Sequence, residues 1–407
     1  MATVVLVGTL DTKGVEYAYM RERLREAGVD VVLVDAGIVG TPLTRPDVTR
    51  EEVARAAGGD IEALADAGDR GAAIEKMAEG AAEIVRRLHA EGRLDAILGL
   101  GGSGGTAIVT SAMRGLPVGV PKLVVSTVAS GDTRPYVGAS DVTMMYSVVD
   151  VAGINRISER ILSNAAAAIA GMAKVELPER EGARPLVGAT MFGVTTPCVT
   201  KARERLEELG YEVLVFHATG TGGQSMEALM RSGFITAALD VTTTELADEL
   251  VGGVLSAGPR RLEAAGELGV PQVVSLGAID MVNFGPIETV PEKFARRRLY
   301  KHNPAITLMR TTPEECAELG RMIARKLNAA KGPTALFVPL RGVSMIAVEG
   351  QVFYDPAADE ALFEALRENV DRERVEVHEL DTDVNDPEFA LTMANRLHEL
   401  CRERRAA

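Results

Sequence analysis

The residues best placed to do chemistry lie in a glycine-rich stretch, ILGLGGSGGT, at residues 97–106. An apolar run there leads directly into four glycines, one serine and one threonine. Glycine lets the backbone approach a ligand closely, and free N–H groups at the start of a helix attract anions. The stretch therefore predicts a binding site for a phosphate or a carboxylate. The residues that we expect to contact this cofactor are Gly101, Gly102, Ser103, Gly104, Gly105 and Thr106.

Two common nucleotide motifs do not account for this stretch. Residues 99–104 formally match G-x-G-x-x-G, but that fingerprint belongs on the first strand and needs an acid about 20 residues further on. The P-loop pattern fails because no lysine precedes Thr106. Lys13 could supply a charge from a neighbouring turn, or it could be a solvated loop lysine. It also remains open that the glycines only allow a tight turn and close packing of a helix on a sheet.

Polar residues also follow the other predicted strands of the first half. Ligands of an open parallel sheet bind beyond the carboxyl ends of its strands, where GTLDTKG (8–14), DAG (35–37) and STVASGDT (126–133) stand here. Carboxylates in such loops could hold a ribose, a metal or a base, or could cap helices. Asp35 closes the second strand, the usual place for a ribose-binding acid. The further cofactor contacts predicted from these loops are Gly8, Thr9, Asp11, Thr12, Lys13, Asp35, Ser130, Gly131 and Asp132.

The second half offers candidates for catalysis. His217 ends a predicted strand and begins a second glycine-rich turn, HATGTGGQS, at 217–225. It could act as a general acid or base, or it could be a buried histidine with a structural partner. Asp280 lies in DMVNFGP, and Arg341 in PLRGVS is placed to clamp an anion. We expect His217, Asp280 and Arg341 to carry any chemistry. Cys198 has no cysteine or histidine partner nearby in the sequence and is expected to be structural.

These candidates depend on an alternation of short β-branched runs and amphipathic helices along the whole chain. That order predicts parallel sheets with helices on both faces. Residues 185–220 repeat the pattern of 4–37, and 270–281 repeat that of 120–132. The predicted fold is α/β, with two pseudo-repeated Rossmann-like lobes and mainly parallel sheets. The predicted domains are a nucleotide-binding lobe at 1–180 and a second lobe at 185–407, joined by a linker at 177–185. Extra strands near 305–312, 334–340 and 375–381 in the second lobe are each expected to be joined through a helix.

Composition limits the kind of protein. The chain has 407 residues and a formal net charge of −14, which argues against broad binding of nucleic acids or anionic membranes. Its three cysteines lie far apart, so we expect no disulfide framework and a cytoplasmic location. No apolar run reaches the roughly 18 residues of a membrane span, and the start favours a strand over a signal peptide. A homo-oligomer, dimer or higher, is the expected assembly.

Several motifs together point to a known family. VGTLDTKGVEYAYMRERL, LGLGGSGGT, STVASGDT, FHATGTGGQSME, LGAIDMVNFG and PLRGVS extend over most of the chain. With them the sequence resembles the bacterial and fungal relatives of the N-terminal, ATP-binding half of the tomato mosaic virus resistance protein. The resemblance implies two Rossmann-like lobes and ATP as the cofactor, with or without Mg²⁺. The plant protein continues into a further barrel-like domain, which we do not expect here, and its inhibition of the virus does not transfer to a stand-alone relative.

Three functions follow as expectations. The first is a protein that binds ATP or another phosphorylated metabolite, as an enzyme with its small-molecule ligand in a cleft between the two lobes. In that cleft the turns at 99–106 and 217–225 would meet. The second is an enzyme that processes a sugar acid or carboxylate without ATP, with His302 joining the three catalytic candidates. The third is a non-catalytic module in which ATP stabilises an interface with a partner.

Overall fold

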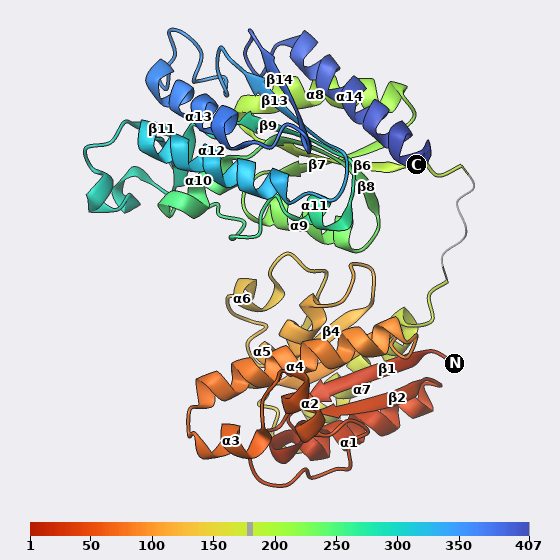
Figure 1. Ribbon diagram of the computed structural model, residues 1–407. Helices are drawn as coiled ribbons and strands as arrows, with labels where there is room; N and C mark the ends of the chain where they lie inside the picture. The colour runs from red at the N-terminus through yellow and green to blue at the C-terminus, as the bar shows by residue number, and fades with distance from the viewer. Residues whose placement is uncertain (177–181, 407) are drawn as a thin grey trace. The chain divides into compact units, whose positions relative to one another are not determined.

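The computed structural model describes residues 1–176 and 182–406, and it divides into two compact units (Figure 1). Unit 1 is Met1–Glu179 and unit 2 is Arg180–Ala407. Residues 177–181 of the predicted linker lie outside the described residues. Within the described part of the chain, no helix combines the length and the apolar character that crossing a membrane requires.

Unit 1 is built on one five-stranded sheet with the order β2-β1-β3-β4-β5. Every neighbouring pair of its strands is parallel. Its strands are β1 (Thr3–Gly8), β2 (Asp30–Asp35), β3 (Ala96–Gly101), β4 (Lys122–Ser126) and β5 (Thr143–Tyr146). Its helices are α1 (Leu10–Glu26), α2 (Arg50–Ala56), α3 (Ile61–Asp66), α4 (Arg70–Ala90), α5 (Ser103–Arg114), α6 (Arg134–Val137) and α7 (Arg156–Met172).

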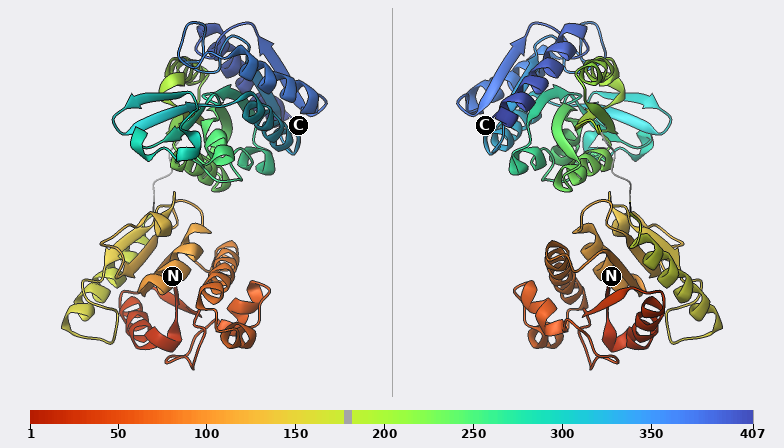
Figure 2. Two further views of the ribbon diagram at one scale, coloured as in Figure 1. Left: turned by 90° about the vertical axis from the view of Figure 1, so that its left-hand side faces the viewer. Right: turned by 90° about the vertical axis from the view of Figure 1, so that its right-hand side faces the viewer.

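The apolar strands of unit 1 explain why helices cover both faces of this sheet (Figure 2). Successive side chains of a strand point to opposite faces. In β1, Val5 and Val7 therefore belong to a core with α2, α4 and α5, whereas Val4 and Leu6 belong to a core with α1 and α7. A strand that is buried on both sides needs a continuous apolar run, which is what TVVLVG supplies.

Unit 2 has a six-stranded sheet with the order β14-β13-β9-β8-β6-β7 and a small three-stranded sheet with the order β10-β12-β11. The strands of the large sheet are β6 (Leu186–Met191), β7 (Glu212–His217), β8 (Ile235–Thr242), β9 (Gln272–Gly277), β13 (Thr334–Pro339) and β14 (Val375–Leu380). Those of the small sheet are β10 (Met281–Phe284), β11 (Leu299–Asn303) and β12 (Ile306–Arg310). The helices are α8 (Thr196–Glu208), α9 (Thr221–Arg231), α10 (Thr244–Val251), α11 (Ala264–Leu268), α12 (Pro313–Asn328), α13 (Pro356–Asn369) and α14 (Pro387–Ala406), with short 3₁₀ turns η1 (Gly193–Thr195), η2 (Ile287–Thr289) and η3 (Glu292–Phe294).

The predicted repeat is confirmed by the strand orders. In unit 1 the sheet begins with the second strand along the chain, followed by the first, third, fourth and fifth strands. The large sheet of unit 2 has the same order when its strands are counted along the chain, as β7-β6-β8-β9-β13, and β14 is added at the edge. The α/β fold of two Rossmann-like lobes is therefore confirmed. The three extra strands are joined through helices as expected, β12 to β13 through α12 and β13 to β14 through α13. The antiparallel pairing of β12 with β11 directly before it was not predicted.

Candidate functional site

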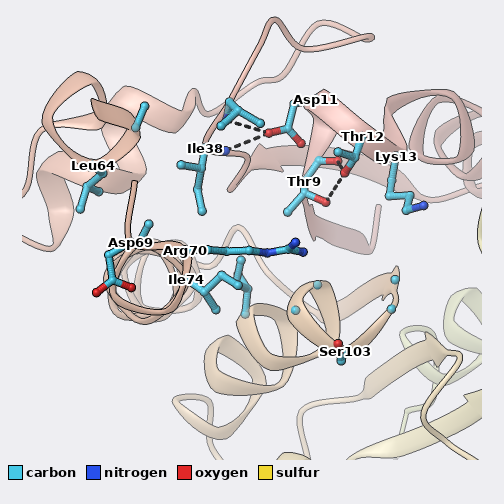
Figure 3. A pocket seen from close by; sticks show the side chains of 18 of the residues that line it. Thr9, Asp11, Thr12, Lys13, Ile38, Leu64, Asp69, Arg70, Ile74 and Ser103 are labelled. Atoms are coloured by element: carbon cyan, nitrogen blue, oxygen red, sulfur yellow. Dashed lines mark hydrogen bonds between the residues drawn. The ribbon is translucent and has the colours of Figure 1, made fainter. Parts of the chain in front are cut away.

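A cavity of about 570 Å³ lies at the carboxyl ends of the strands in unit 1 (Figure 3). β1 and β3 are neighbours in the sheet, and the helices that follow them, α1 and α5, pack on opposite faces. Such a switch point in strand order is where open α/β sheets bind ligands. The predicted residues that line the cavity are Thr9, Asp11, Thr12, Lys13, Gly101, Gly102, Ser103, Gly104 and Gly105.

The first turn of α5 presents bare backbone to this cavity. Gly102 precedes the helix and has no side chain that could cap it. The N–H group of Thr106 donates to the carbonyl oxygen of Gly102, which is the first hydrogen bond of the helix. The preceding N–H groups, those of Ser103, Gly104 and Gly105, therefore have no intrahelical partner. The partial positive charge of a helix N-terminus adds to these donors. This geometry suits an anion.

Part of the glycine content has a packing reason. A Cβ atom added to Gly99 would lie 2.4 Å from Cγ1 of Val109, so β3 and α5 approach too closely there for any side chain. A Cβ on Gly102, in contrast, would meet no atom closer than the Oγ1 of Thr127 at 3.8 Å. The packing interpretation therefore holds for Gly99, whereas Gly102 is open toward the cavity.

Arg70 is a charged lining residue that the sequence interpretation missed. It begins α4 and is exposed, and a Cβ atom added to Gly104 would lie 3.9 Å from its Nη2 atom. Figure 3 shows its side chain extending between Thr9 and Ser103. Among the described residues, no hydrogen bond or ion pair holds this guanidinium. No motif marks Arg70, because only the fold brings it next to a turn more than 30 residues later in the chain.

The remaining unpredicted part of the cavity wall is mostly aliphatic. These side chains come from the loop after β2 and from α3, α4 and α5, and are Ile38, Val39, Leu64, Ala65, Ala73, Ile74 and Ile108. Asp150, after β5, also lines the cavity and is exposed. The site thus combines a polar end, formed by α5 and Arg70, with an apolar wall.

Asp11 and Lys13 both line the cavity, but each already contacts the backbone. Oδ2 of Asp11 accepts hydrogen bonds from the N–H groups of Ile38 (2.9 Å) and Val39 (3.0 Å), which fixes the loop after β2. Nζ of Lys13 donates to the carbonyl oxygen of Val151. Asp11 therefore shapes the cavity, and a ligand would have to compete with a carbonyl group for Lys13.

Asp35, Thr106 and Gly8 lie beneath the cavity and do not line it. The fully buried Asp35 accepts from the N–H groups of Leu10 (3.1 Å) and Gly37 (2.8 Å) and pairs with Nε of Arg50 (2.9 Å). These partners give the Asp35 carboxylate a structural role.

Similar internal partners explain the other two residues. The hydroxyl groups of Thr106 and Ser126 are 2.6 Å apart and both side chains are buried. A Cβ atom on Gly8 would fall 1.9 Å from the hydroxyl oxygen of Tyr17. That hydroxyl accepts from the N–H of Leu100 and donates to the carbonyl oxygen of Val7, and burial raises its pKa. Tyr17 thus ties β1 to β3 directly beneath the switch point.

Ser130, Gly131 and Asp132 are exposed in the loop after β4 and are not lining residues of the cavity. Nε and Nη2 of Arg134 donate to the two carboxylate oxygens of Asp132 at 2.9 and 2.8 Å. These hydrogen bonds lower the pKa of Asp132 to about 2. The loop is therefore a separate surface feature in this structure.

The structure does not bring His217, Asp280 and Arg341 together. His217 ends β7, whereas Asp280 and Arg341 follow β9 and β13. β7 and β13 are four steps apart in the sheet, roughly 19 Å at ~4.8 Å per strand. Asp280 is fully buried, which raises its pKa, and it accepts from the hydroxyl of Ser344 at 2.9 Å. His217 and Arg341 are exposed, and Arg341 pairs with Asp381.

Two further features concern possible reactive groups. The three cysteines, Cys198, Cys316 and Cys401, are buried, and burial raises the pKa of the Cys198 thiol. The described residues contain no group of three or more His, Cys, Asp or Glu side chains that could hold a metal ion.

Comparison with known proteins identifies the family. The chain is 56% identical over 394 residues to a UPF0261 protein of Clostridium tetani, covering 97% of this chain and 98% of the relative. It is 40% identical to the ToMV resistance protein Tm-1(GCR237) of Solanum lycopersicum, covering 98% of this chain but 55% of the plant protein. The predicted resemblance is thereby confirmed.

Solved structures add little to this. A UDP-GlcNAc 2-epimerase of Methanocaldococcus jannaschii matches with 10% identity and a TM-score of 0.23 over 67% of this chain and 83% of the epimerase, which is too weak to support any argument.

Models of the N-terminal and C-terminal domains of one family match residues 2–178 and 184–401. The chain therefore belongs to the uncharacterised protein family UPF0261, with one family domain in each unit.

Proposed function

We propose that unit 1 binds a phosphorylated nucleotide in its cavity, and that ATP, which the resemblance implies, is the first nucleotide to test. The observation that carries the proposal is the position of Arg70. Its guanidinium has no partner among the described residues and lies beside the uncapped first turn of α5. Arginine and helix N-termini are both common phosphate ligands, and here they face the same space.

The two ends of the cavity suit the two ends of a nucleotide. The phosphates would accept hydrogen bonds from the N–H groups of Ser103, Gly104 and Gly105 and from Arg70. The aliphatic wall around Ile38 and Ile74 would cover the base. Ligand pockets are commonly apolar with a few polar groups that fix the orientation, and this cavity follows that pattern.

A divalent cation fits this arrangement only in company with the nucleotide. Magnesium is usually held by one or two carboxylates together with substrate phosphates. The cavity offers Asp150 as an exposed carboxylate and Thr9, Thr12 and Ser103 as hydroxyl ligands. The phosphates would have to supply the remaining oxygen atoms.

The alternative of a sugar-acid enzyme in unit 2 has less support. It requires a site shared by His217, Asp280 and Arg341, and these residues lie at the carboxyl ends of three different strands. A carboxylate ligand in the unit 1 cavity remains compatible with Arg70 and α5, so the experiment includes one.

The test is calorimetric titration of ATP, AMP and citrate into the parent protein and Arg70→Met. Methionine keeps an unbranched side chain but removes the charge. Charge-assisted hydrogen bonds contribute about 1.5–3 kcal/mol, so we expect ATP affinity to fall roughly 10- to 100-fold. Arg93→Met is the matched control, because Arg93 is exposed and precedes β3, at the opposite end of that strand. Equal ATP affinity of the parent and Arg70→Met would contradict the proposal.

A further inference from the structure

The turn between the third strand and the helix that follows it differs between the two units, where these elements are β3 and α5 in unit 1 and β8 and α10 in unit 2. In unit 1, Gly102 precedes α5, and Ser103 and Gly104 begin it. In unit 2, Thr243 precedes α10, and Thr244 and Glu245 begin it. Counted from the residue before each helix, Glu245 takes the position of Gly104. A bare backbone position in one unit is therefore a carboxylate in the other.

The Glu245 carboxylate binds the second glycine-rich turn of the sequence. Its Oε1 accepts hydrogen bonds from the N–H groups of Gly220 (2.7 Å) and Gly223 (3.1 Å). A Cβ atom on Gly223 would lie 2.2 Å from Oε2, so glycine is needed there to admit the carboxylate. The turn at 217–225 thus does hold an anion, but the anion comes from the protein itself.

An arginine guanidinium lies beside Gly104 in unit 1 and beside Glu245 in unit 2. In unit 2 it belongs to Arg261, whose Nε is 2.6 Å from Oε2 of Glu245 and whose side chain is only 1% exposed. Arg261 also binds Asp240 through two contacts of 2.6 Å. In unit 1 a guanidinium from a different part of the topology, that of Arg70 on α4, lies near Gly104 and has no such partner among the described residues.

Buried threonine side chains fill the space beside Glu245 at the ends of β6 and β8. Thr242, Thr243 and Thr244 are fully buried, as is Thr195 after β6. The hydroxyl groups of Thr195 and Thr242 are 2.8 Å apart, directly between the ends of β6 and β8. The switch point of unit 2 is therefore filled by side chains, whereas that of unit 1 is a cavity.

We propose that Glu245 is a built-in ligand: its carboxylate occupies the glycine-rich turn at the start of α9 in unit 2, whereas the glycine-rich turn at the start of α5 in unit 1 stays open for a bound molecule. The full chain then binds one anionic ligand instead of two. The number of ligands per chain rests on the proposed function of unit 1, whereas the role of Glu245 does not. Removing the carboxylate creates an anion site in unit 2 that accepts a small free carboxylate.

The experiment uses Glu245→Ala and acetate, which carries the atoms that the substitution removes. The full-length variant is melted in increasing sodium acetate and, at equal ionic strength, in sodium chloride. We expect a lower Tm than that of the parent in chloride and a selective recovery in acetate. Glu249→Ala is the control: Glu249 lies on the same helix, and its partner is the hydroxyl of Ser256, so the advantage of acetate over chloride should be no larger than in the parent. If Glu245→Ala does not fold in chloride, acetate must restore its folded circular dichroism spectrum.

The two possible failures are distinguishable. An advantage of acetate over chloride that is no larger for Glu245→Ala than for the parent overturns the built-in ligand, whatever ATP does. Calorimetry of ATP with the parent protein supplies the second readout, and we expect one site per chain. Two sites per chain would also overturn the inference. No ATP binding at all would contradict the proposed function, while recovery in acetate would still support the role of Glu245.

Discussion

Nη2 of Arg70 lies 3.9 Å from the point where a Cβ atom of Gly104 would be, although the two residues belong to different helices. This proximity places a cation against the uncapped first turn of α5. It also means that a side chain introduced at Gly104 would compete with a ligand for the same guanidinium. Substitutions in this turn therefore test the site without changing the core.

Gly102→Val should abolish ATP binding while the fold survives. The closest atom to an added Cβ is 3.8 Å away, so the side chain has room in the free protein but would project where a phosphate must approach. Valine is a poor N-cap, and we expect a loss of roughly 1 kcal/mol in stability. Calorimetry on a protein with the circular dichroism of the parent is the check. Unchanged affinity in such a protein would remove the turn from the site.

Gly104→Glu should make unit 1 resemble unit 2. The new carboxylate would face Arg70 and occupy the anion position, so ATP affinity should fall by at least 10-fold with little loss of stability. Gly104→Gln is the control of equal size without the charge. The closest atom to the added Cβ is the end of the Ile74 side chain, at 3.3 Å, which can move. If the two variants bind ATP equally well, charge competition is not the cause.

Asp248 should make the stability of unit 2 depend on pH. Burial raises the pKa of its carboxyl group to about 7, although hydrogen bonds from Asn283 oppose the shift. The folded state therefore keeps a proton that the unfolded state loses near pH 4, so this group lowers stability as pH rises from about 4 to 7. The total effect is up to roughly 4 kcal/mol, with no further change above that range.

Asp248→Asn isolates this effect. The variant keeps an oxygen that can accept from the N–H groups of Leu255 and Asn283, and it cannot ionise. Its free energy of unfolding, measured in urea at several pH values, should rise relative to the parent between pH 4 and 7. A difference that stays constant over this range would show that Asp248 does not titrate there.

His217→Ala separates a shared cleft from a site within unit 1. The sequence-based expectation that the turns at 99–106 and 217–225 meet around one ligand remains a prediction. On that arrangement, removing the imidazole should weaken ATP binding. Our proposal, in which Glu245 already occupies the second turn, predicts the same ATP affinity as the parent. A fall of 10-fold or more would favour the shared cleft.

Sequence patterns predicted the fold, but they did not predict the contacts of the side chains at the candidate site. The repeat of 4–37 in 185–220 corresponds to β1-α1-β2 and β6-α8-β7, because apolar periodicity and turn glycines are local signals. The glycine-rich turn after β3 was found for the same reason. The partners of Asp35 and Lys13 were not predictable, since Arg50 and Val151 meet them only through the fold.

The same limit explains the residues that were missed. Arg70 has no motif of its own, and its approach to Gly104 depends on the packing of α4 beside α5. Glu245 reaches Gly220 and Gly223 from a helix that begins more than 20 residues later. A comparison of the two repeats at this helix start would have shown glycine in one and glutamate in the other, which is a signal present in the sequence.

The most direct test of the central claim is a crystal structure of the full chain with a non-hydrolysable ATP analogue. The account predicts phosphate oxygens about 3 Å from the N–H groups of Ser103, Gly104 and Gly105 and from the guanidinium of Arg70, with Glu245 still bound to Gly220 and Gly223. An analogue bound elsewhere in the protein, with the unit 1 cavity free of it, would contradict the account.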